Sequence, residues 1–423
     1  MNCLLIIGQT FPEPTTTAAG VRMLQLIEMF TRQGYHITFA SSATSSDKSV
    51  DLQTLGVATE QIAINDASFD DFVTQLNPTL VLFDRFITEE QFAWRVSQSC
   101  PKALKILDTE DLHFLRKARQ QALKDAIDVK DANLFTETAK REIASILRCD
   151  LSLIISEFEM ELLTGTFAVS KELLYYLPFM VTEFVDSDSF PGFKQRANFM
   201  TIGNLLHGPN IDSVLYLKKE IWPLIKKQLP KAQLYIYGNY APQHILELHN
   251  QKQGFYIMGW ADCAATVMQK ARVCLAPLRF GAGLKGKLLD AMLNGTPGVT
   301  TSIGAEGMYP DTINPDCIAD TPEDFAKLCV AIYTDKTKWE QNAQRGIEII
   351  KARYNGKAIA KEFMSHLGDL TTRLALHRQA HFIGQILQHQ SLQASKYLSK
   401  WIEEKKKYNI YPLKQSAIRN VKE

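Results

Sequence analysis

Three cations stand where a helix is expected to begin. Arg279, Lys285 and Lys287 lie in and just after a glycine-containing loop, whereas a helix start carries partial positive charge and favours acidic side chains. The free backbone N–H groups of a helix start bind anions, and neighbouring cations reinforce that binding. Gly281 and Gly283 would let the backbone approach such an anion closely. The loop and the helix start therefore predict an anion-binding site.

Asp290 lies one turn further into the same expected helix. It follows Lys287 by three residues, so the two side chains share a face. A carboxylate just behind an anion site can accept hydrogen bonds from sugar hydroxyls. Cations for a diphosphate and a carboxylate for a ribose together indicate a nucleotide-sugar site. The alternative is an ordinary surface ion pair between Lys287 and Asp290, with Arg279 as a solvated loop residue.

The elements that position these residues alternate between strand and helix. We expect a strand at 273–277, the loop at 279–283, a helix at 284–294 and another strand at 299–301. Gly295 and Pro297 end the helix.

The chain begins with the same alternation. A strand at 3–8, a helix at 20–32 and a strand at 35–40 form a βαβ unit, which implies a parallel sheet. The pattern restarts at residue 199, after a polar linker at 186–198. We therefore expect two doubly wound α/β halves, 1–185 and 199–365, that face each other across a cleft.

Polar residues also follow strands in the amino-terminal half. Asp84 directly follows an apolar strand at 79–83, and Glu110, Asp111 and His113 follow a second strand at 105–107. In open parallel sheets, ligands bind beyond the carboxyl ends of the strands. These four residues are therefore candidates for catalysis or acceptor binding. The alternative for the second group is a helix start rich in acids that pair with Arg116.

The start of the first helix is another candidate anion site. Gly20 and Arg22 stand there, after a loop that does not match the GxGxxG dinucleotide pattern. They could receive a phosphate or an acceptor group. An ordinary helix start that binds no ligand is an equally good interpretation of these two residues.

Composition limits the possible functions. The formal net charge is +1 over 423 residues, so the whole-chain field gives no reason to expect nucleic acid or membrane binding. No apolar run approaches the ~20 residues of a spanning helix, and the short apolar run at 3–7 lacks the basic lead of a signal peptide. The seven cysteines form no CxxC pair. A reduced, cytoplasmic protein is therefore expected.

The last residues, 366–423, are expected to form a helical basic tail. Within 371–423, ten Lys and Arg stand against three Glu, with aromatic residues interspersed. Such a tail could give peripheral contact with an anionic membrane at its inner face. A helix that returns to pack on the amino-terminal half is the favoured interpretation. His377 and His381 are spaced for metal binding, but a solvated helix face is favoured and no metal is expected.

The second half resembles the donor domain of the retaining glycosyltransferases of family four (glycosyl transferases group 1), which have the GT-B fold. The resemblance is carried by 202-IGNLLHGPNIDSV-214, 222-WPLIKKQLPKAQLYIYG-238, 258-MGWAD-262 and 275-LAPLRFGAGLKGKLLDAMLNGTPGVTTSIGAEGM-308. In addition, 108-DTEDLHFLRK-117 resembles an acceptor-side loop of some such enzymes. The implied fold is α/β GT-B, with two Rossmann-like domains facing each other.

The resemblance implies roles for individual residues. The donor diphosphate would be held by basic residues and loop N–H groups, from Arg279, Gly281, Gly283, Lys285, Lys287, Gly203 and Asn204. Asp290 would bind the ribose, Gly259, Trp260 and Ala261 would contact the base, and Gly20 would approach the phosphates or the acceptor. The family signature has two glutamates separated by seven residues. Asp290 stands in place of the second glutamate, and Ala282 occupies the position of the first.

The implied reaction moves a hexose from a nucleoside diphosphate sugar to a hydroxyl of a glycan, glycolipid or protein, with retention. The nucleotide sugar is a co-substrate, no further cofactor is expected, and the setting would be surface polysaccharide, glycolipid or glycoconjugate synthesis. Two alternatives remain open: a nucleotide-sugar 2-epimerase on the same fold, and a non-catalytic module that binds a nucleotide sugar or a partner protein.

Overall fold

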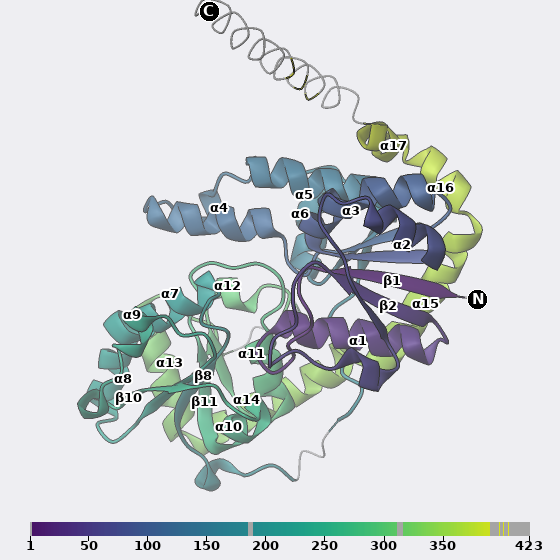
Figure 1. Ribbon diagram of the computed structural model, residues 1–423. Coiled ribbons are helices and arrows are strands. Elements are labelled where there is room, and N and C mark those ends of the chain that lie inside the picture. Colours follow the sequence, from purple (N-terminus) through teal and green to yellow (C-terminus); the bar gives the residue numbers. More distant parts are fainter. Residues whose placement is uncertain are drawn as a thin grey trace, which may run out of the picture.

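The computed structural model describes residues 2–184, 189–310 and 316–389, together with Tyr397, Trp401 and Lys405. Two lobes lie side by side, each built on a parallel sheet (Figure 1). Within the described residues, no helix is long and apolar enough to cross a membrane. Residues 186–188 of the expected linker, and most of the tail after 389, lie outside the described residues.

The amino-terminal lobe contains a seven-stranded sheet within the described residues. Its strands, in spatial order, are β3 (Ala58–Gln61), β2 (His36–Ser41), β1 (Cys3–Gly8), β4 (Leu80–Asp84), β5 (Leu104–Asp108), β6 (Leu151–Ile154) and β7 (Leu174–Tyr176). Its helices are α1 (Ala18–Arg32), α2 (Ser68–Leu76), α3 (Arg85–Ser99), α4 (His113–Lys124), α5 (Glu137–Arg148) and α6 (Glu157–Gly165). The strand order reverses between β1 and β4.

Both faces of this sheet are covered because its strands are apolar on both sides. Along β1, Leu4 and Ile6 pack with α1, whereas Leu5 and Ile7 pack with helices of the other face such as α3. This alternation follows from the two-residue period of a strand. Continuous apolar runs of this kind are typical of buried parallel strands.

The carboxy-terminal lobe contains a five-stranded parallel sheet within the described residues. Its strands, in spatial order, are β10 (Phe255–Gly259), β9 (Leu234–Tyr237), β8 (Ala197–Ile202), β11 (Ala271–Ala276) and β12 (Gly298–Thr300). Its helices are α7 (Gly208–Tyr216), α8 (Trp222–Gln228), α9 (Gln243–Leu246), α10 (Ala264–Lys270), α11 (Gly286–Leu293), α12 (Ser302–Ala305), α13 (Pro322–Thr334) and α14 (Lys336–Arg353). The order reverses between β8 and β11, so ligands are expected at the loops that follow these two strands.

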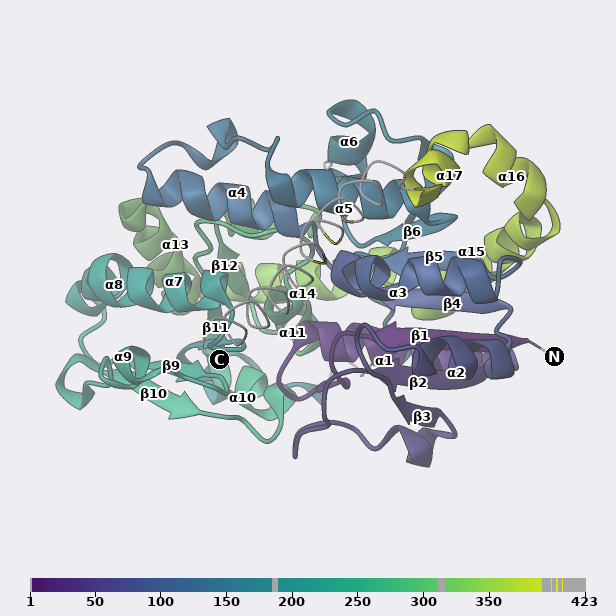
Figure 2. The same ribbon diagram turned by 45° about the horizontal axis from the view of Figure 1, so that its top comes forward.

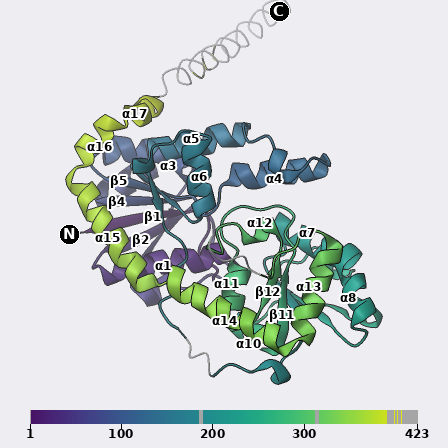
Figure 3. The ribbon, with the colours of Figure 1, turned by 180° about the vertical axis from the view of Figure 1, so that it is seen from behind.

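The chain then returns to the first lobe. After α14 come α15 (Gly356–Thr372), α16 (Leu374–Ala380) and α17 (Phe382–His389), which follow the edge of the amino-terminal lobe (Figure 3). Phe363 and Leu367 of α15 pack in the same core as α1. The packing of the amino-terminal lobe thus includes α15, which begins at Gly356, inside the range expected for the donor domain.

An apolar cluster joins the two lobes. Ile155 and Phe179 of the first lobe pack with Leu284 and Leu288 of the second. Tyr354, between α14 and α15 where the chain returns to the first lobe, is fully buried in the same cluster. The amino end of α11 consequently lies against the amino end of α1 (Figure 2). A Cβ on Gly286 would lie 2.9 Å from Cβ of Ala18.

Candidate functional site

The amino end of α11 lies at the switch point of the second sheet. Lys285 is the N-cap residue, no described side chain caps the helix, and its first turn has no acidic residue. Gly283 has a φ of +63°, which favours glycine. Lys285 is buried, and its Nζ donates to the carbonyl oxygen of Gly283 at 2.6 Å. The structure therefore places a buried cation beside a helix end that no described side chain caps.

Lys287 joins this helix to the loop after β8. Its Nζ donates to Oδ1 of Asn210 at 2.8 Å, and Nδ2 of Asn210 donates to the carbonyl oxygen of Asn204 at 2.9 Å. Burial lowers the pKa of Lys287 to about 8. A Cβ on Gly203 would lie 2.6 Å from Nδ2 of Asn210. Lys287, Gly203 and Asn204 are thus brought together, as their expected shared role requires.

Asp290 has an unengaged carboxylate. No hydrogen bond or ion pair to its side chain occurs within the described residues. Burial raises the pKa of Asp290 to about 6. The carboxylate is only half-buried, so hydrogen-bond donors from solvent or from a ligand can reach it. Ribose hydroxyls would be such donors.

Arg279 is held by its own lobe. Its Nε donates to Oδ2 of Asp212 at 2.9 Å, and the guanidinium lies 4.7 Å from the ring centre of Tyr216. The pKa of Arg279 is raised by its hydrogen bonds to Asp212. To contact a diphosphate, this side chain would have to leave or share that partner.

Two strained residues follow β4 and β5 in the amino-terminal lobe. Arg85 and Glu110 have φ values of +70° and +63°, a region that non-glycine residues rarely adopt. Oε1 of Glu110 and Oδ1 of Asp84 are buried without a described partner. Desolvation and the charge of Asp108 raise the pKa of Glu110 to about 8. Strain and unpaired buried oxygens of this kind accumulate at functional sites.

Asp111 and His113 differ from Glu110 in having partners. Arg116 binds Asp111 with two hydrogen bonds of 2.6 and 3.2 Å, and Nε2 of His113 lies 3.3 Å from Oδ1 of Asp111. Burial raises the pKa of Asp111, but the charge of Arg116 outweighs burial and holds this pKa below its usual range. Burial lowers the pKa of His113 to about 4. Of the two acidic residues, Glu110 therefore has the less satisfied carboxyl group.

Glu159, which sequence reasoning did not single out, joins the two halves of the site. Its Oε1 accepts from the backbone N–H of Leu112 at 3.0 Å and from that of Gly283 at 2.8 Å. Its Oε2 is buried without a described partner, and burial raises the pKa of Glu159 to about 7. Glu159 thus reaches the residue next to Ala282, where the family pattern has a carboxylate.

Arg119 makes a second contact between the two lobes, next to that of Glu159. Arg119 of α4 forms a bidentate ion pair with Glu306, with two hydrogen bonds of 2.7 Å, and donates to the carbonyl oxygen of Gly281 at 2.9 Å. The sequence signal for these contacts is weak: Glu159 lies in the first turn of the helix after β6, and Arg119 lies in the helix after β5. Their partners in the carboxy-terminal lobe lie 124 to 187 residues away in sequence.

The expected ligand role of Gly20 and Arg22 does not fit this geometry. The N–H of Gly20 donates to Oγ1 of Thr17 at 3.0 Å, and a Cβ there would lie 2.5 Å from the backbone of Glu13. Arg22 is fully buried, and both Nε and Nη2 bond Asp108. Close packing and a structural ion pair, rather than an anion, account for these two residues.

The expected base-binding residues lie at a second contact between the lobes, near Thr15 and Lys48 of the amino-terminal lobe. Gly259 has a φ of +74°, and Ala261 is half-buried. Nε1 of Trp260 donates to the carbonyl oxygen of Thr15 at 3.4 Å, and Nζ of Lys48 lies 3.7 Å above its ring. The indole is still 37% exposed, so its ring is available to a partner.

Comparison with known proteins agrees with this architecture. Residues 196–335 match the family model described as glycosyl transferases group 1. A curated relative, an uncharacterised 44.6 kDa protein in the cps region of Klebsiella pneumoniae, is 26% identical over 172 residues. That match covers 39% of this chain and 44% of the relative.

Several solved structures share the fold. Sucrose-phosphate synthase from Thermosynechococcus elongatus has a TM-score of 0.69 at 14% identity, covering 88% of this chain and 100% of that one. Anabaena HepE in complex with UDP and glucose has a TM-score of 0.65 at 14% identity, with the same coverage. WaaG, a glycosyltransferase involved in lipopolysaccharide biosynthesis, has a TM-score of 0.60 at 12% identity, covering 85% and 98%. The expected GT-B fold is confirmed.

Proposed function

We propose that this protein is a glycosyltransferase that moves a hexose from a nucleoside diphosphate sugar to a hydroxyl acceptor, with retention. The observation that carries the proposal is the arrangement after β8 and β11. There, Lys285 and Lys287 stand at the start of α11, no described side chain caps it, and the carboxylate of Asp290 has no described partner. A diphosphate and a ribose would satisfy these groups together.

The relatives support a setting for this activity. HepE has been crystallised with UDP and glucose, WaaG acts in lipopolysaccharide biosynthesis, and the Klebsiella relative comes from a cps region. Surface polysaccharide, glycolipid or glycoconjugate synthesis in the cytoplasm is accordingly the proposed role. The acceptor would be a glycan, glycolipid or protein.

The reaction breaks the bond between the anomeric carbon and the diphosphate oxygen and forms a glycosidic bond to the acceptor oxygen. Negative charge builds on the leaving diphosphate, and Lys285, Lys287 and the N–H groups of α11 would stabilise it. The acceptor proton passes to a leaving phosphate oxygen. Glu110, which is strained and lacks a described partner for Oε1, would position the acceptor hydroxyl.

A donor screen tests the nucleotide part of the proposal. We expect UDP-, GDP- or ADP-sugars to raise the melting temperature, because a ligand of the native state stabilises it by mass action. TDP-sugars, which lack the ribose 2′-hydroxyl, should give a smaller shift if Asp290 binds the ribose. The Asp290→Leu variant should bind the best donor about 10- to 100-fold more weakly, since a hydrogen bond to a charged group contributes roughly 1.5–3 kcal/mol. If the donor raises the melting temperature of Asp290→Leu as much as that of the wild type, Asp290 does not bind the donor.

Glu159 would place a negative charge beside the donor loop in the position left by Ala282. The Glu159→Gln variant keeps an oxygen that accepts from Leu112 and Gly283 but removes the charge. We expect its turnover to fall by about tenfold, or ~1.4 kcal/mol in the barrier. Because the pKa of Glu159 is raised to about 7, its negative charge is present above that pH and is lost as the pH falls through it. Wild-type activity should therefore rise through pH 7, and the variant should lack this rise. Identical pH profiles would assign Glu159 a structural role alone.

A 2-epimerase is the second candidate, because it needs a carboxylate base and the raised pKa values of Glu110 and Glu159 lie near neutrality. Incubation with UDP-GlcNAc alone separates the two. An epimerase isomerises the sugar without an acceptor, whereas a transferase does not.

A further inference from the structure

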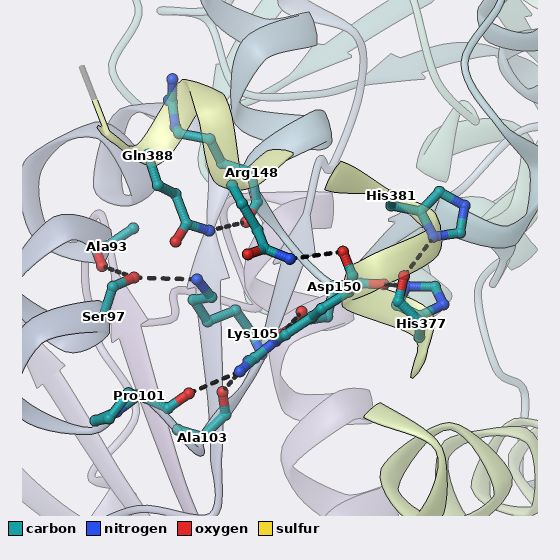
Figure 4. A network of polar contacts seen from close by, with 12 residues as sticks. Ala93, Ser97, Pro101, Ala103, Lys105, Arg148, Asp150, His377, His381 and Gln388 are labelled. Carbon is teal, nitrogen blue, oxygen red and sulfur yellow. Dashed lines mark hydrogen bonds and ion pairs between the residues drawn. The ribbon is translucent and has the colours of Figure 1, made fainter. Parts of the chain in front are cut away.

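The histidine pair expected on a solvated helix face lies instead against the amino-terminal lobe. His377 of α16 is only 7% exposed, and its Nε2 lies 2.8 Å from the carbonyl oxygen of Asp150 (Figure 4). The helical tail expected at 366–423 is also interrupted at His381, between α16 and α17. The interpretation of a solvated face is therefore wrong for His377.

Both rings have one nitrogen engaged by a backbone carbonyl. Nδ1 of His381 lies 2.9 Å from the carbonyl oxygen of His377, and the two ring centres are 4.5 Å apart. A carbonyl only accepts, so the nitrogen that faces it carries the hydrogen of a neutral imidazole. The lone pairs are thus left on Nδ1 of His377 and Nε2 of His381. Histidines that bind metals have their second nitrogen held in this way.

A carboxylate completes the group. Oε2 of Glu172 lies 3.6 Å from Nε2 of His381, and Oγ of Ser170 lies 3.2 Å from the same nitrogen. Glu172, His377 and His381 each offer one ligand atom within 4.8 Å of the other two. The Glu172 side chain is 70% exposed, so it can move the short distance that closer ligation requires.

Acidic partners reduce the positive charge around the group. Asp150 binds Arg378 through two hydrogen bonds of 2.7 and 2.8 Å, and Glu89 binds Arg148, whereas Lys105 lines the same pocket as the histidines. Glu172 has no cationic partner among the described residues other than His381 when that ring is protonated. Two neutral imidazoles and a carboxylate are the ligands of zinc sites that keep a fourth position for water.

We propose that Glu172, His377 and His381 bind one divalent transition-metal ion, with Zn²⁺ as the natural choice. Glu172 belongs to a 3₁₀ turn (Lys171–Leu173) just before β7, whereas both histidines belong to the returning segment. The ion would therefore fasten α16 to the edge of the amino-terminal lobe. This site lies between the returning segment (α15 to α17) and the amino-terminal lobe, and it is independent of the proposed transfer reaction.

Zinc titration of the full chain, purified without a histidine tag and treated with chelator, tests the site. Calorimetry with ZnCl₂ should show one ion per chain, and the ion should raise the melting temperature. His381→Ala and Glu172→Gln should each weaken Zn²⁺ binding by about tenfold or more, since zinc sites of this type rely on three protein ligands. His389→Ala, which removes an exposed histidine of α17 outside the group, is the matched control and should bind as the wild type does.

Two results would overturn the proposal. One is the absence of stoichiometric Zn²⁺ binding by the wild-type chain. The other is binding that both substitutions leave unchanged, which would locate the ion elsewhere. Glu172→Gln alters only an exposed side chain, so its effect can be interpreted even if His381→Ala loosens the returning segment.

Discussion

Replacing Lys285 with methionine is expected to lower the rate of sugar transfer by about 10²–10³-fold, the usual effect of removing one group that stabilises transition-state charge. Lys285 is the N-cap of α11 and is buried between the two lobes, near Glu159 and Glu306. Burial lowers its pKa, and a diphosphate that gains charge would interact strongly with it in this water-poor setting. Methionine fills a similar volume, so the core should stay packed.

Steady-state kinetics with the best donor from the screen measures this effect, and the melting temperature verifies the fold. Lys227→Met, at an exposed position of α8, is the matched control and should be as active as the wild type. A Lys285→Met enzyme within twofold of wild-type activity would contradict the assignment of Lys285 to the diphosphate.

Replacing Arg22 with methionine is expected to lower the free energy of unfolding by about 3–5 kcal/mol, because it leaves a buried carboxylate without its partner. Arg22 and Asp108 are both fully buried and are joined by three hydrogen bonds of 2.7 to 3.1 Å. Nη1 of Arg22 also donates to the carbonyl oxygen of Leu177 at 2.7 Å. The pair therefore links α1 to the ends of β5 and β7.

Urea unfolding measures this loss. Arg32→Met, which breaks an exposed pair with Glu28 on the same helix, should cost less than about 1 kcal/mol. The double variant Arg22→Met with Asp108→Leu should recover part of the loss, since it removes the unpaired charge. Equal effects of Arg22→Met and Arg32→Met would contradict the structural role of the buried pair.

The fold could be predicted where local pattern and global fold agree. The buried strands β1, β4 and β5 are short apolar runs, and glycine or proline ends the segments around them. The helix expected at 284–294 appears as Gly286–Leu293. Its cationic start, without acidic residues, predicts an anion site from sequence alone, and this role of the site stays a prediction.

The other contacts could not be predicted because distant residues supply them. A cation at the start of α1 suggests an anion site, but the partner of Arg22 is Asp108, 86 residues away. Glu159 looks like an ordinary acid in the first turn of a helix until Gly283 of the other lobe is placed beside it. His377 likewise looks solvent-facing until α16 is packed on Asp150.

The central claim is that the loop after β11 and the start of α11 hold a nucleoside diphosphate sugar for transfer. Its most direct test is to incubate the wild-type protein and Lys285→Met with the stabilising donor and follow release of the nucleoside diphosphate. The account predicts release by the wild type, acceleration by a hydroxyl acceptor, and a loss of about 10²–10³-fold in the variant. Recovery of intact donor from a wild-type protein that binds it, with or without acceptor, would contradict the account and leave a nucleotide-sugar binding module.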